Sequence, residues 1–147
     1  MAAGVEPARA RTRLVVENKP SELARLGDWS DSMAARLRLG RDAAYALRLC
    51  LEEAVGNIVA YAYAPGSTHS IMIEVWREGE RVEALVSDDG RAFDPLGVPE
   101  PVAPSDVLTA PSGGLGIKLM RKFASRVAYR RDGGRNHLRF SFDNSSS

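Results

Sequence analysis

The sequence predicts an α+β fold, a two-layer sandwich in which helices cover one face of a mainly antiparallel sheet. Apolar and polar residues alternate over 71–75 and again over 82–86, which is the period of half-buried strands. Between residues 47 and 58 the apolar positions recur every three or four residues, which is the period of a helix. Strands and helices follow one another without an internal repeat, and this order favours one mixed domain.

The first third of the chain predicts a short strand followed by helices. Leu14 to Val16 form the strand, and one or two helical turns at a time follow from Pro20, with Gly40 as the stop signal. Asp42 is suited to cap the next helix, which is the longest and ends before Pro65.

The rest of the chain predicts two hairpins and one more helix. Residues 78–80, Glu-Gly-Glu, are expected to turn between two strands. A helix is expected at about 115–124, followed by strands over 127–131 and 137–142. The domain is therefore expected to span 13–142, with flexible tails at 1–12 and 143–147.

Composition excludes several classes of protein. The chain has 147 residues, 44% of them hydrophobic, and a formal net charge of +1, so no global field drives it onto nucleic acid. Arginines between 126 and 139 alternate with apolar residues, as in a half-exposed sheet, and we expect neither nucleic-acid nor membrane binding.

Cys50 is the only cysteine, which excludes a disulfide framework. With no secretory or membrane-spanning run, we expect a cytoplasmic location.

Residues 95–112 hold five prolines and no hydrophobic periodicity. A loop of this length in a compact domain is either a linker or a lid over a site. Because the residues after 112 supply too little for a second domain, we expect a lid.

The lid runs into a glycine-rich loop at 111–120, PSGGLGIKLM. It is not a P-loop, because Ile117 precedes Lys118 and Leu119 follows it, and it lacks the third glycine and the preceding strand of a dinucleotide fingerprint. Glycines before a helix still let the backbone and its free N–H groups approach an anion, although a plain glycine hinge is the alternative.

Glu53 and Asn57 stand four residues apart among apolar residues of the longest predicted helix, so they share a face. An asparagine oxygen is suited to Mg²⁺ that is also bound by phosphates, and a glutamate one turn away could take a proton from an attacking hydroxyl. Glu52 competes for this role but points about 100° away. A solvated stripe on an amphipathic helix is the alternative.

Asp88 closes a strand in which Val82, Ala84 and Val86 point to the same face. A carboxylate on an apolar face needs a donor, and the amine of an adenine would be one. Gly90 would let a flat base come close to the backbone. An ordinary Asp-Asp-Gly turn is the alternative.

These features occur in a specific order along the chain. A helical Glu-x-x-x-Asn comes first, then a strand-terminal Asp-x-Gly before Phe93-Asp94-Pro95, then a proline-rich lid, and finally Gly-Gly-x-Gly. The succession resembles the N, G1 and G2 boxes of the GHKL ATPase superfamily, whose domain is the Bergerat fold. Within it, the chain is most similar to the small anti-sigma-factor serine kinases of bacteria. The resemblance covers roughly residues 13–142.

The resemblance implies a role for each matching residue. Glu53 corresponds to the catalytic base and Asn57 to the magnesium ligand, with ATP and Mg²⁺ as cofactors. The implied ATP-binding residues are Asn57, Asp88, Gly90, Gly113, Gly114, Leu115, Gly116, Ile117 and Lys118.

The sequence departs from the family pattern in three places. Tyr61 stands where the family commonly has histidine, Ala92 replaces the second glycine of the G1 box, and Ser125-Arg126 stands where an acidic residue is usual. The first two changes remove no reactive group named above, and the third bears on the contacts that this region makes.

The resemblance implies an ATP-dependent protein serine kinase that phosphorylates an anti-anti-sigma antagonist, sequesters a sigma factor and forms a homodimer. Two alternatives remain. One is a module that holds ATP and switches partners without phosphorylating them, and the intact Glu53 argues against it. The other is the ATPase domain of a histidine kinase, but no preceding helical hairpin carries a phosphoacceptor histidine.

Overall fold

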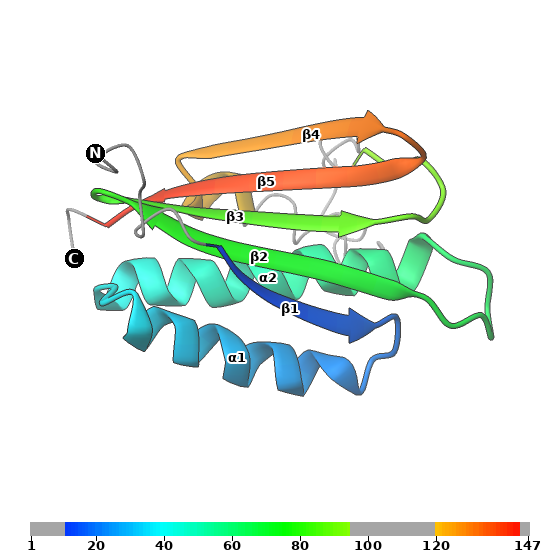
Figure 1. Cartoon of the computed structure of the whole chain (residues 1–147), viewed down its shortest axis with the longest axis horizontal. Helices are drawn as coiled ribbons and strands as arrows, with labels where there is room; N and C mark the ends of the chain where they lie inside the picture. The colour runs from blue at the N-terminus through cyan, green and yellow to red at the C-terminus, as the bar shows by residue number, and fades with distance from the viewer. Residues whose placement is uncertain (1–10, 95–119, 145–147) are drawn as a thin grey trace, which may run out of the picture.

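The computed structural model describes residues 11–94 and 120–144 (Figure 1). The elements follow in the order β1 (Thr12–Glu17), α1 (Glu22–Arg36), α2 (Arg41–Tyr61), β2 (Ser70–Glu78), β3 (Arg81–Asp88), β4 (Arg126–Asp132) and β5 (Arg135–Asp143). Met120 to Phe123 form a further helical turn before β4, where the predicted third helix was expected to end.

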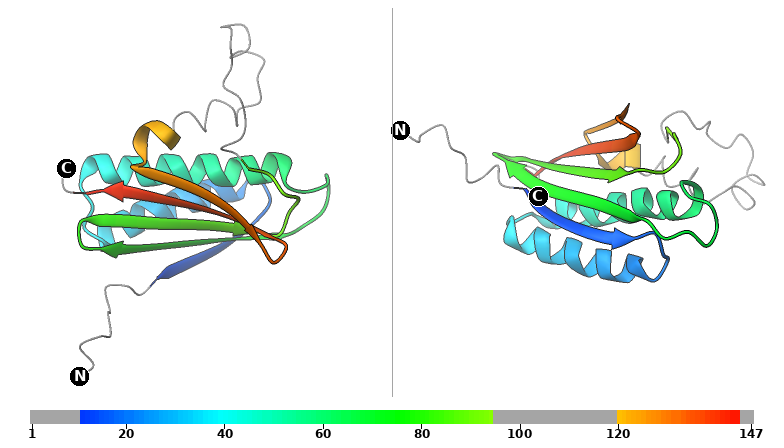
Figure 2. Two further views of the ribbon diagram at one scale, coloured as in Figure 1. Left: turned by 90° about the horizontal axis from the view of Figure 1, so that it is seen from above. Right: turned by 45° about the vertical axis from the view of Figure 1, so that its right-hand side comes forward.

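The five strands form one antiparallel sheet in the order β1-β2-β3-β5-β4. Both helices lie on the same face of this sheet, as the two views of Figure 2 show. The predicted α+β two-layer sandwich is therefore confirmed. Two-residue turns close the β2–β3 and β4–β5 hairpins, and the glycines at 79, 133 and 134 adopt the positive φ that such turns require.

Two helix boundaries differ from the prediction. α1 is one continuous helix of 15 residues that ends at Arg36, and Arg38 takes the left-handed conformation (φ 57°) that reverses the chain. Gly40 is therefore not the stop of α1 but the N-cap of α2, where its backbone N–H donates to Asn144 Oδ1 at 2.9 Å. Asp42 lies in the first turn of α2 rather than at its cap, where its charge still suits the helix dipole.

The core lies between the helices and the sheet. Leu47, Leu51 and Val55 of α2 are fully buried against Ile73 and Phe140 of the sheet, and the other core residues follow the predicted periods. α2 thus runs along the middle of the sheet, and its side chains determine what the interior at either end contains.

The folded region extends slightly beyond the predicted bounds of 13–142. Thr12 already pairs with Val75 in the sheet. At the other end Asp143 closes β5, and the Asn144 N–H donates to the Glu80 carbonyl at 2.8 Å. Asn144 therefore connects the end of β5 by hydrogen bonds to the β2–β3 turn and to the loop before α2.

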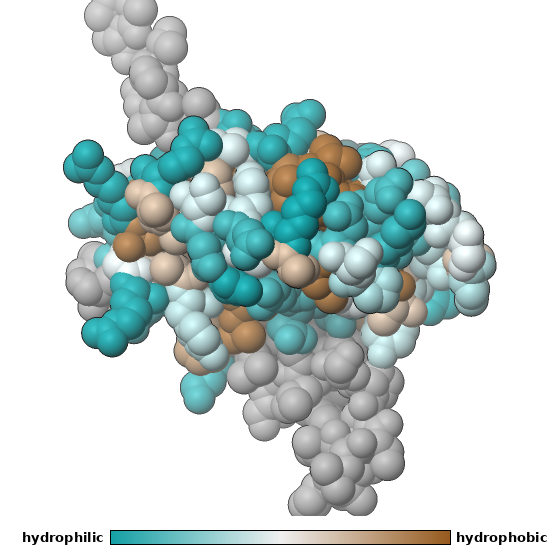
Figure 3. Space-filling view, turned by 90° about the horizontal axis from the view of Figure 1, so that it is seen from below, coloured by the Kyte–Doolittle hydropathy of each residue, from teal (hydrophilic) through white to brown (hydrophobic). Residues whose placement is uncertain are grey.

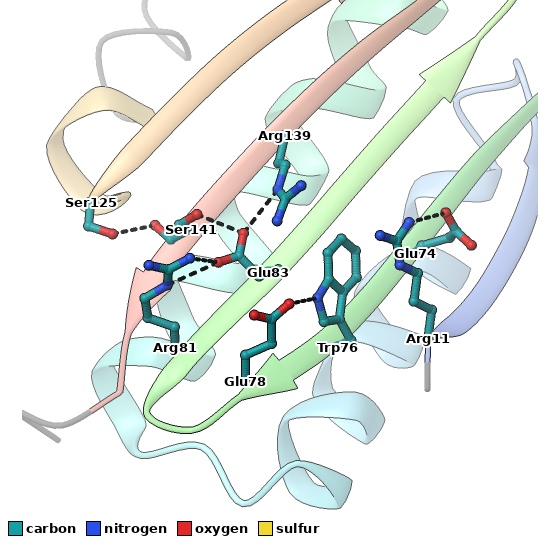
Figure 4. A network of polar contacts seen from close by, with 9 residues as sticks. All are labelled: Arg11, Glu74, Trp76, Glu78, Arg81, Glu83, Ser125, Arg139 and Ser141. Carbon is teal, nitrogen blue, oxygen red and sulfur yellow. Dashed lines mark hydrogen bonds and ion pairs between the residues drawn. The ribbon is translucent and has the colours of Figure 1, made fainter. Parts of the chain in front are cut away.

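The other face of the sheet carries a network of charged residues around Trp76 (Figure 4). The Glu83 side chain is fully buried there, where it accepts hydrogen bonds from Ser141 at 2.7 Å, from Arg81 at 2.9 Å and from Arg139 at 3.1 Å. Burial raises the pKa of Glu83, but these donors more than offset it and hold the pKa below the usual value. Arg139, one of the arginines singled out in the sequence, is thus committed to an ion pair.

Within residues 11–94 and 120–144, no helix has the length and apolar character that crossing a membrane would require.

Candidate functional site

The polar residues predicted on the longest helix lie together on α2. Asn57 is buried, with 5% of its surface exposed, and its Nδ2 has no hydrogen-bond partner among the described residues. Glu53, one turn earlier, is half-buried, and within the same residues no hydrogen bond or ion pair involves its carboxylate. Burial, and then the neighbouring Glu52, raise the pKa of Glu53. Both side chains therefore have unused binding capacity.

Glu52, the competitor of Glu53, is already engaged. Its Oε2 accepts a hydrogen bond from Arg48 Nε at 3.2 Å, and the same guanidinium forms an ion pair with Asp31 of α1. Gly27 lets this guanidinium pass, since a Cβ there would lie 2.6 Å from Arg48 Nη2. Glu52 thus belongs to the contact between the two helices, and the assignment of Glu53 as the base stays a prediction.

Glu53 and Asn57 border a groove, which we name the Glu53 groove. It has a volume of about 630 Å³ and lies between Pro20 and Leu23, at the start of α1, and the stretch of α2 from Glu52 to Ala60. Figure 3, viewed from the side on which α1 lies, shows this face as largely hydrophilic with separate apolar patches. The volume is in the range of ligand-binding clefts.

Asp88 lies at the end of β3 with 2% of its surface exposed, on the core face of the sheet as predicted. Its Oδ1 accepts hydrogen bonds from the Gly90 backbone N–H at 2.8 Å and from Asn136 Nδ2 at 3.0 Å. The first of these is the ordinary turn contact that was the alternative interpretation. No described residue donates to Oδ2, so the carboxylate retains an acceptor.

Gly90 is held against the end of α2. A Cβ at this position would lie 2.6 Å from the Ala62 carbonyl oxygen and 2.7 Å from the Ala62 Cβ. The next residue, Arg91, donates its backbone N–H to the same carbonyl at 3.0 Å. Glycine is therefore needed here by packing alone, whether or not a ligand approaches.

A small hollow connects Asp88 with α2. Its walls are mostly apolar residues of α2, β3 and β5, together with the polar side chains of Asn57, Asp88 and Asn136 and the ring of Phe93. Its volume of about 30 Å³ has room for roughly one water molecule. Apolar walls around a carboxylate acceptor suit the chemistry of an adenine, but a purine would require this hollow to widen.

Asn136 is a site residue that the sequence analysis missed. It pairs directly with Asp88 across the sheet, and besides Asp88 its Nδ2 reaches the Arg91 carbonyl at 2.9 Å. Its Oδ1 accepts from the Tyr129 hydroxyl at 2.6 Å and from Arg131 Nη1 at 3.1 Å. Every hydrogen-bonding atom of this buried amide is therefore used, and Asp88 is held in one orientation.

Arg131 also donates to the Gly90 carbonyl at 2.7 Å. It thereby fixes the loop after β3 from the side of β4. The sequence pattern had assigned this arginine to an ordinary half-exposed strand.

Tyr63 and Asp89 stabilise the outer side of the same loop. The Tyr63 hydroxyl donates to Asp89 Oδ1 at 2.8 Å, and the His69 ring stacks on Tyr63 with a centroid distance of 4.1 Å. The hydrogen bond from Tyr63 lowers the pKa of Asp89. Of the departures from the family pattern, Ala92 lies in this loop, and the Tyr61 ring contacts Phe93 with a centroid distance of 5.9 Å.

The remaining predicted site residues lie outside the described residues. These are the lid at 95–112 and the loop residues Gly113, Gly114, Leu115, Gly116, Ile117 and Lys118. Within the part of the chain that is described, no group of three or more His, Cys, Asp or Glu side chains is placed to hold a metal. A cation at Asn57 would therefore need ligands from another source, such as phosphate oxygens.

The family model described as "Histidine kinase-like ATPase domain" matches residues 16–142, nearly the whole chain. The chain belongs to this family. The resemblance to GHKL ATPases that the three boxes indicated is therefore confirmed.

Two curated relatives of this ATPase-domain chain are protein kinases. Serine/threonine-protein kinase BtrW of Bordetella bronchiseptica is 34% identical over 110 residues, which cover 75% of this chain and 78% of BtrW. Serine-protein kinase RsbW of Halalkalibacterium halodurans is 28% identical over 106 residues, which cover 69% of this chain and 64% of RsbW.

Solved structures share the fold. The RsbU and RsbW domains of Rv1364c from Mycobacterium tuberculosis match with a TM-score of 0.67 and 12% identity, covering 91% of this chain and 32% of that one. A blue-light activated histidine kinase of Erythrobacter litoralis matches with a TM-score of 0.56 and 18% identity, covering 86% of this chain and 42% of that one. This chain thus spans about a third of the first protein and less than half of the second.

Proposed function

We propose that this ATPase-domain protein is an ATP- and Mg²⁺-dependent serine/threonine protein kinase of the anti-sigma-factor type. Its acceptor is an anti-anti-sigma antagonist, and it sequesters a sigma factor in a partner-switching pathway. One observation carries the proposal: Glu53 is half-buried and without a partner among the described residues, one helical turn from the buried Asn57, while the adjacent Glu52 is neutralised by Arg48. The kinase names of the two curated relatives support it.

The buried polar atoms fit the proposed nucleotide in chemistry. Asp88 Oδ2 would accept the hydrogen bond of the adenine amine, and the Asn57 side chain, at the boundary between the small hollow and the Glu53 groove, would supply a ligand to Mg²⁺. Residues 113–118 would surround the phosphates with backbone N–H groups. When bound, Mg²⁺-ATP supplies the phosphoryl group and an in-line leaving group.

Glu53 acts as the general base in this proposal. It orients the hydroxyl of the acceptor serine and takes its proton while the serine oxygen bonds to the γ-phosphorus. The bond from that phosphorus to the β,γ-bridging oxygen breaks, and ADP leaves with the electron pair. Partial burial suits this role, because a carboxylate with a raised pKa holds a proton better than an ordinary one.

Glu53→Gln tests the assignment. The amide keeps the size of the side chain but cannot accept a proton, so phosphorylation of the antagonist should fall about 10²–10⁴-fold while ATP affinity stays within a few-fold. Asn57→Ala is the matched comparison on the same helix face, and it should weaken ATP binding in Mg²⁺ but change it little in EDTA.

The same assay separates the kinase from the module that only holds ATP. If the wild-type chain binds ATP and the antagonist without phosphorylating it, the switch is correct and the kinase is wrong. Undiminished transfer by Glu53→Gln would remove Glu53 as the base. The homodimer implied by the family resemblance is part of the proposal and is tested by light scattering of the purified chain.

A further inference from the structure

Gly56 occupies an unusual position in α2. It lies inside a 21-residue helix, more than one turn before the last residue Tyr61 and between Glu53 and Asn57, where glycine is the least favourable residue after proline. The backbone does not require it, since its φ is that of the surrounding helix. Packing does not require it either, because apart from the adjacent residues and the backbone of α2 itself, no atom of the described residues lies within 4 Å of the position that a Cβ would take.

Other glycines of the protein differ in this respect. At Gly27 and at Gly90 an added Cβ would come within 2.6 Å of another atom, so those two glycines serve the packing of the fold. Gly56 instead lines the Glu53 groove and is half-exposed there. The missing side chain leaves open space along the helix backbone at the point where Glu53 and Asn57 face the groove.

The charge of the groove indicates what can enter it. Its charged lining residues are Glu52 and Glu53. Apart from Asn57 the other lining residues are small or apolar, with Leu23 on the side of α1 and Val59 on the side of α2. Among the described lining residues there is no lysine or arginine, and of the two carboxylates Glu52 is paired with Arg48 while Glu53 has no partner among the described residues. A neutral or basic polypeptide meets apolar walls and a free proton acceptor.

The groove and the small hollow around Asp88 also divide the site. Glu53 lines only the groove, Asp88 lines only the hollow, and Asn57 lines both. If the nucleotide base lies at Asp88, the phosphates reach Asn57, and the group that gives its proton to Glu53 must come from the groove.

We propose that the Glu53 groove receives the acceptor segment of the antagonist, and that Gly56 lets its backbone lie directly against α2 beside the attacking serine. The inference rests on the proposed kinase function. It specifies the chemistry of the segment, which has small or apolar neighbours around the serine and no acidic residue at the positions that face Glu52 and Glu53.

Gly56→Ala and Gly56→Gln test the inference. Both residues favour the helix over glycine, so each variant should be more stable than the wild type, by about fivefold in the folding equilibrium constant for alanine. Both side chains fill the groove, so the KM for the antagonist should rise about threefold for alanine and tenfold or more for glutamine. ATP affinity should stay within about twofold, because Gly56 does not line the hollow at Asp88. A gain in stability with a loss of acceptor binding is not expected of a structural residue.

Ser32→Ala is the matched control. Ser32 is exposed on α1 and does not line the groove, so this variant gains helix propensity and should leave the KM for the antagonist unchanged. The probe is the anti-anti-sigma protein that the wild-type chain phosphorylates with labelled ATP.

The outcomes distinguish the groove from the kinase function. If the wild type phosphorylates its antagonist and Gly56→Gln does so with the same KM, the groove is not the acceptor site, although the kinase stands. If Gly56→Gln loses ATP affinity in proportion to its activity, the groove holds the nucleotide instead. If the wild type phosphorylates no anti-anti-sigma protein, both proposals are wrong.

Discussion

Replacing Asn136 by alanine should destabilise the protein by about 2–4 kcal/mol. Asn136 is 6% exposed and donates both to the carboxylate of the buried Asp88 and to the Arg91 carbonyl. A hydrogen bond to a charged group contributes about 1.5–3 kcal/mol and a neutral one about 0.5–1.5 kcal/mol. Tyr129 and Arg131, which donate to Asn136 Oδ1, are exposed enough to form hydrogen bonds with water in the variant. The loss of these two bonds therefore adds little to the destabilisation.

The assay is urea unfolding followed by circular dichroism, with Asn18→Ala as the matched control. Asn18 also makes two hydrogen bonds, to the Ser67 carbonyl at 3.0 Å and from the His69 N–H at 2.7 Å, but neither involves a carboxylate. The control should lose about 1–3 kcal/mol and less than Asn136→Ala. Equal losses in the two variants would refute the reasoning, because the bond to Asp88 would then be worth no more than a bond to a backbone group.

Two further substitutions test the surroundings of the site. Gly90→Ala places a Cβ 2.6 Å from the Ala62 carbonyl oxygen, and because a backbone atom cannot easily yield, the cost in urea unfolding should be about 1–3 kcal/mol. An unchanged free energy of unfolding would mean that the loop moves freely. Glu53→Gln should gain stability relative to the wild type as the pH rises. The folded-state pKa of Glu53 is raised, so the protonated Glu53 side chain stabilises the fold of the wild type below the ordinary glutamate pKa. This stabilisation is lost as the pH rises through the folded-state pKa of Glu53. The gain, under about 1 kcal/mol at this half-buried position, should appear as a Tm difference that grows between about pH 4 and pH 7. A difference in Tm that does not vary with pH would show that burial does not raise this pKa.

Much of the fold could be predicted because its signals are local. Alternation over 71–75 and 82–86 identified β2 and β3, and it placed Asp88 on the buried face without knowledge of the partner strands. The helix boundaries were less accurate, because the turn after α1 uses Arg38 in a conformation that glycine usually supplies. Gly40 was therefore free to begin α2 instead of ending α1.

The residues around Asp88 could not be predicted in the same way. Asn136 is 48 residues away, and its role depends on the register of β3 with β5, which no local pattern specifies. Arg131 likewise reaches Gly90 across the sheet, although its sequence context resembles an exposed strand. By contrast, the expectation that Glu52 and Glu53 point in different directions needed only the 100° step of a helix, and that is a local property.

Three unfavourable features occur within a little more than one turn of α2. Glu53 is half-buried without a partner among the described residues, and the pKa shift that results opposes folding at neutral pH. Asn57 leaves a buried Nδ2 unpaired within the same residues, which costs about 1–3 kcal/mol. Gly56 between them weakens the helix by about 1 kcal/mol without a packing reason. Each would be easy to improve by a single substitution, and local rules that fail together at one place are typical of a binding or catalytic site. A helix that served only to cover the sheet would have no reason to keep all three, whereas the proposed kinase function uses the free carboxylate of Glu53 and the open space at Gly56.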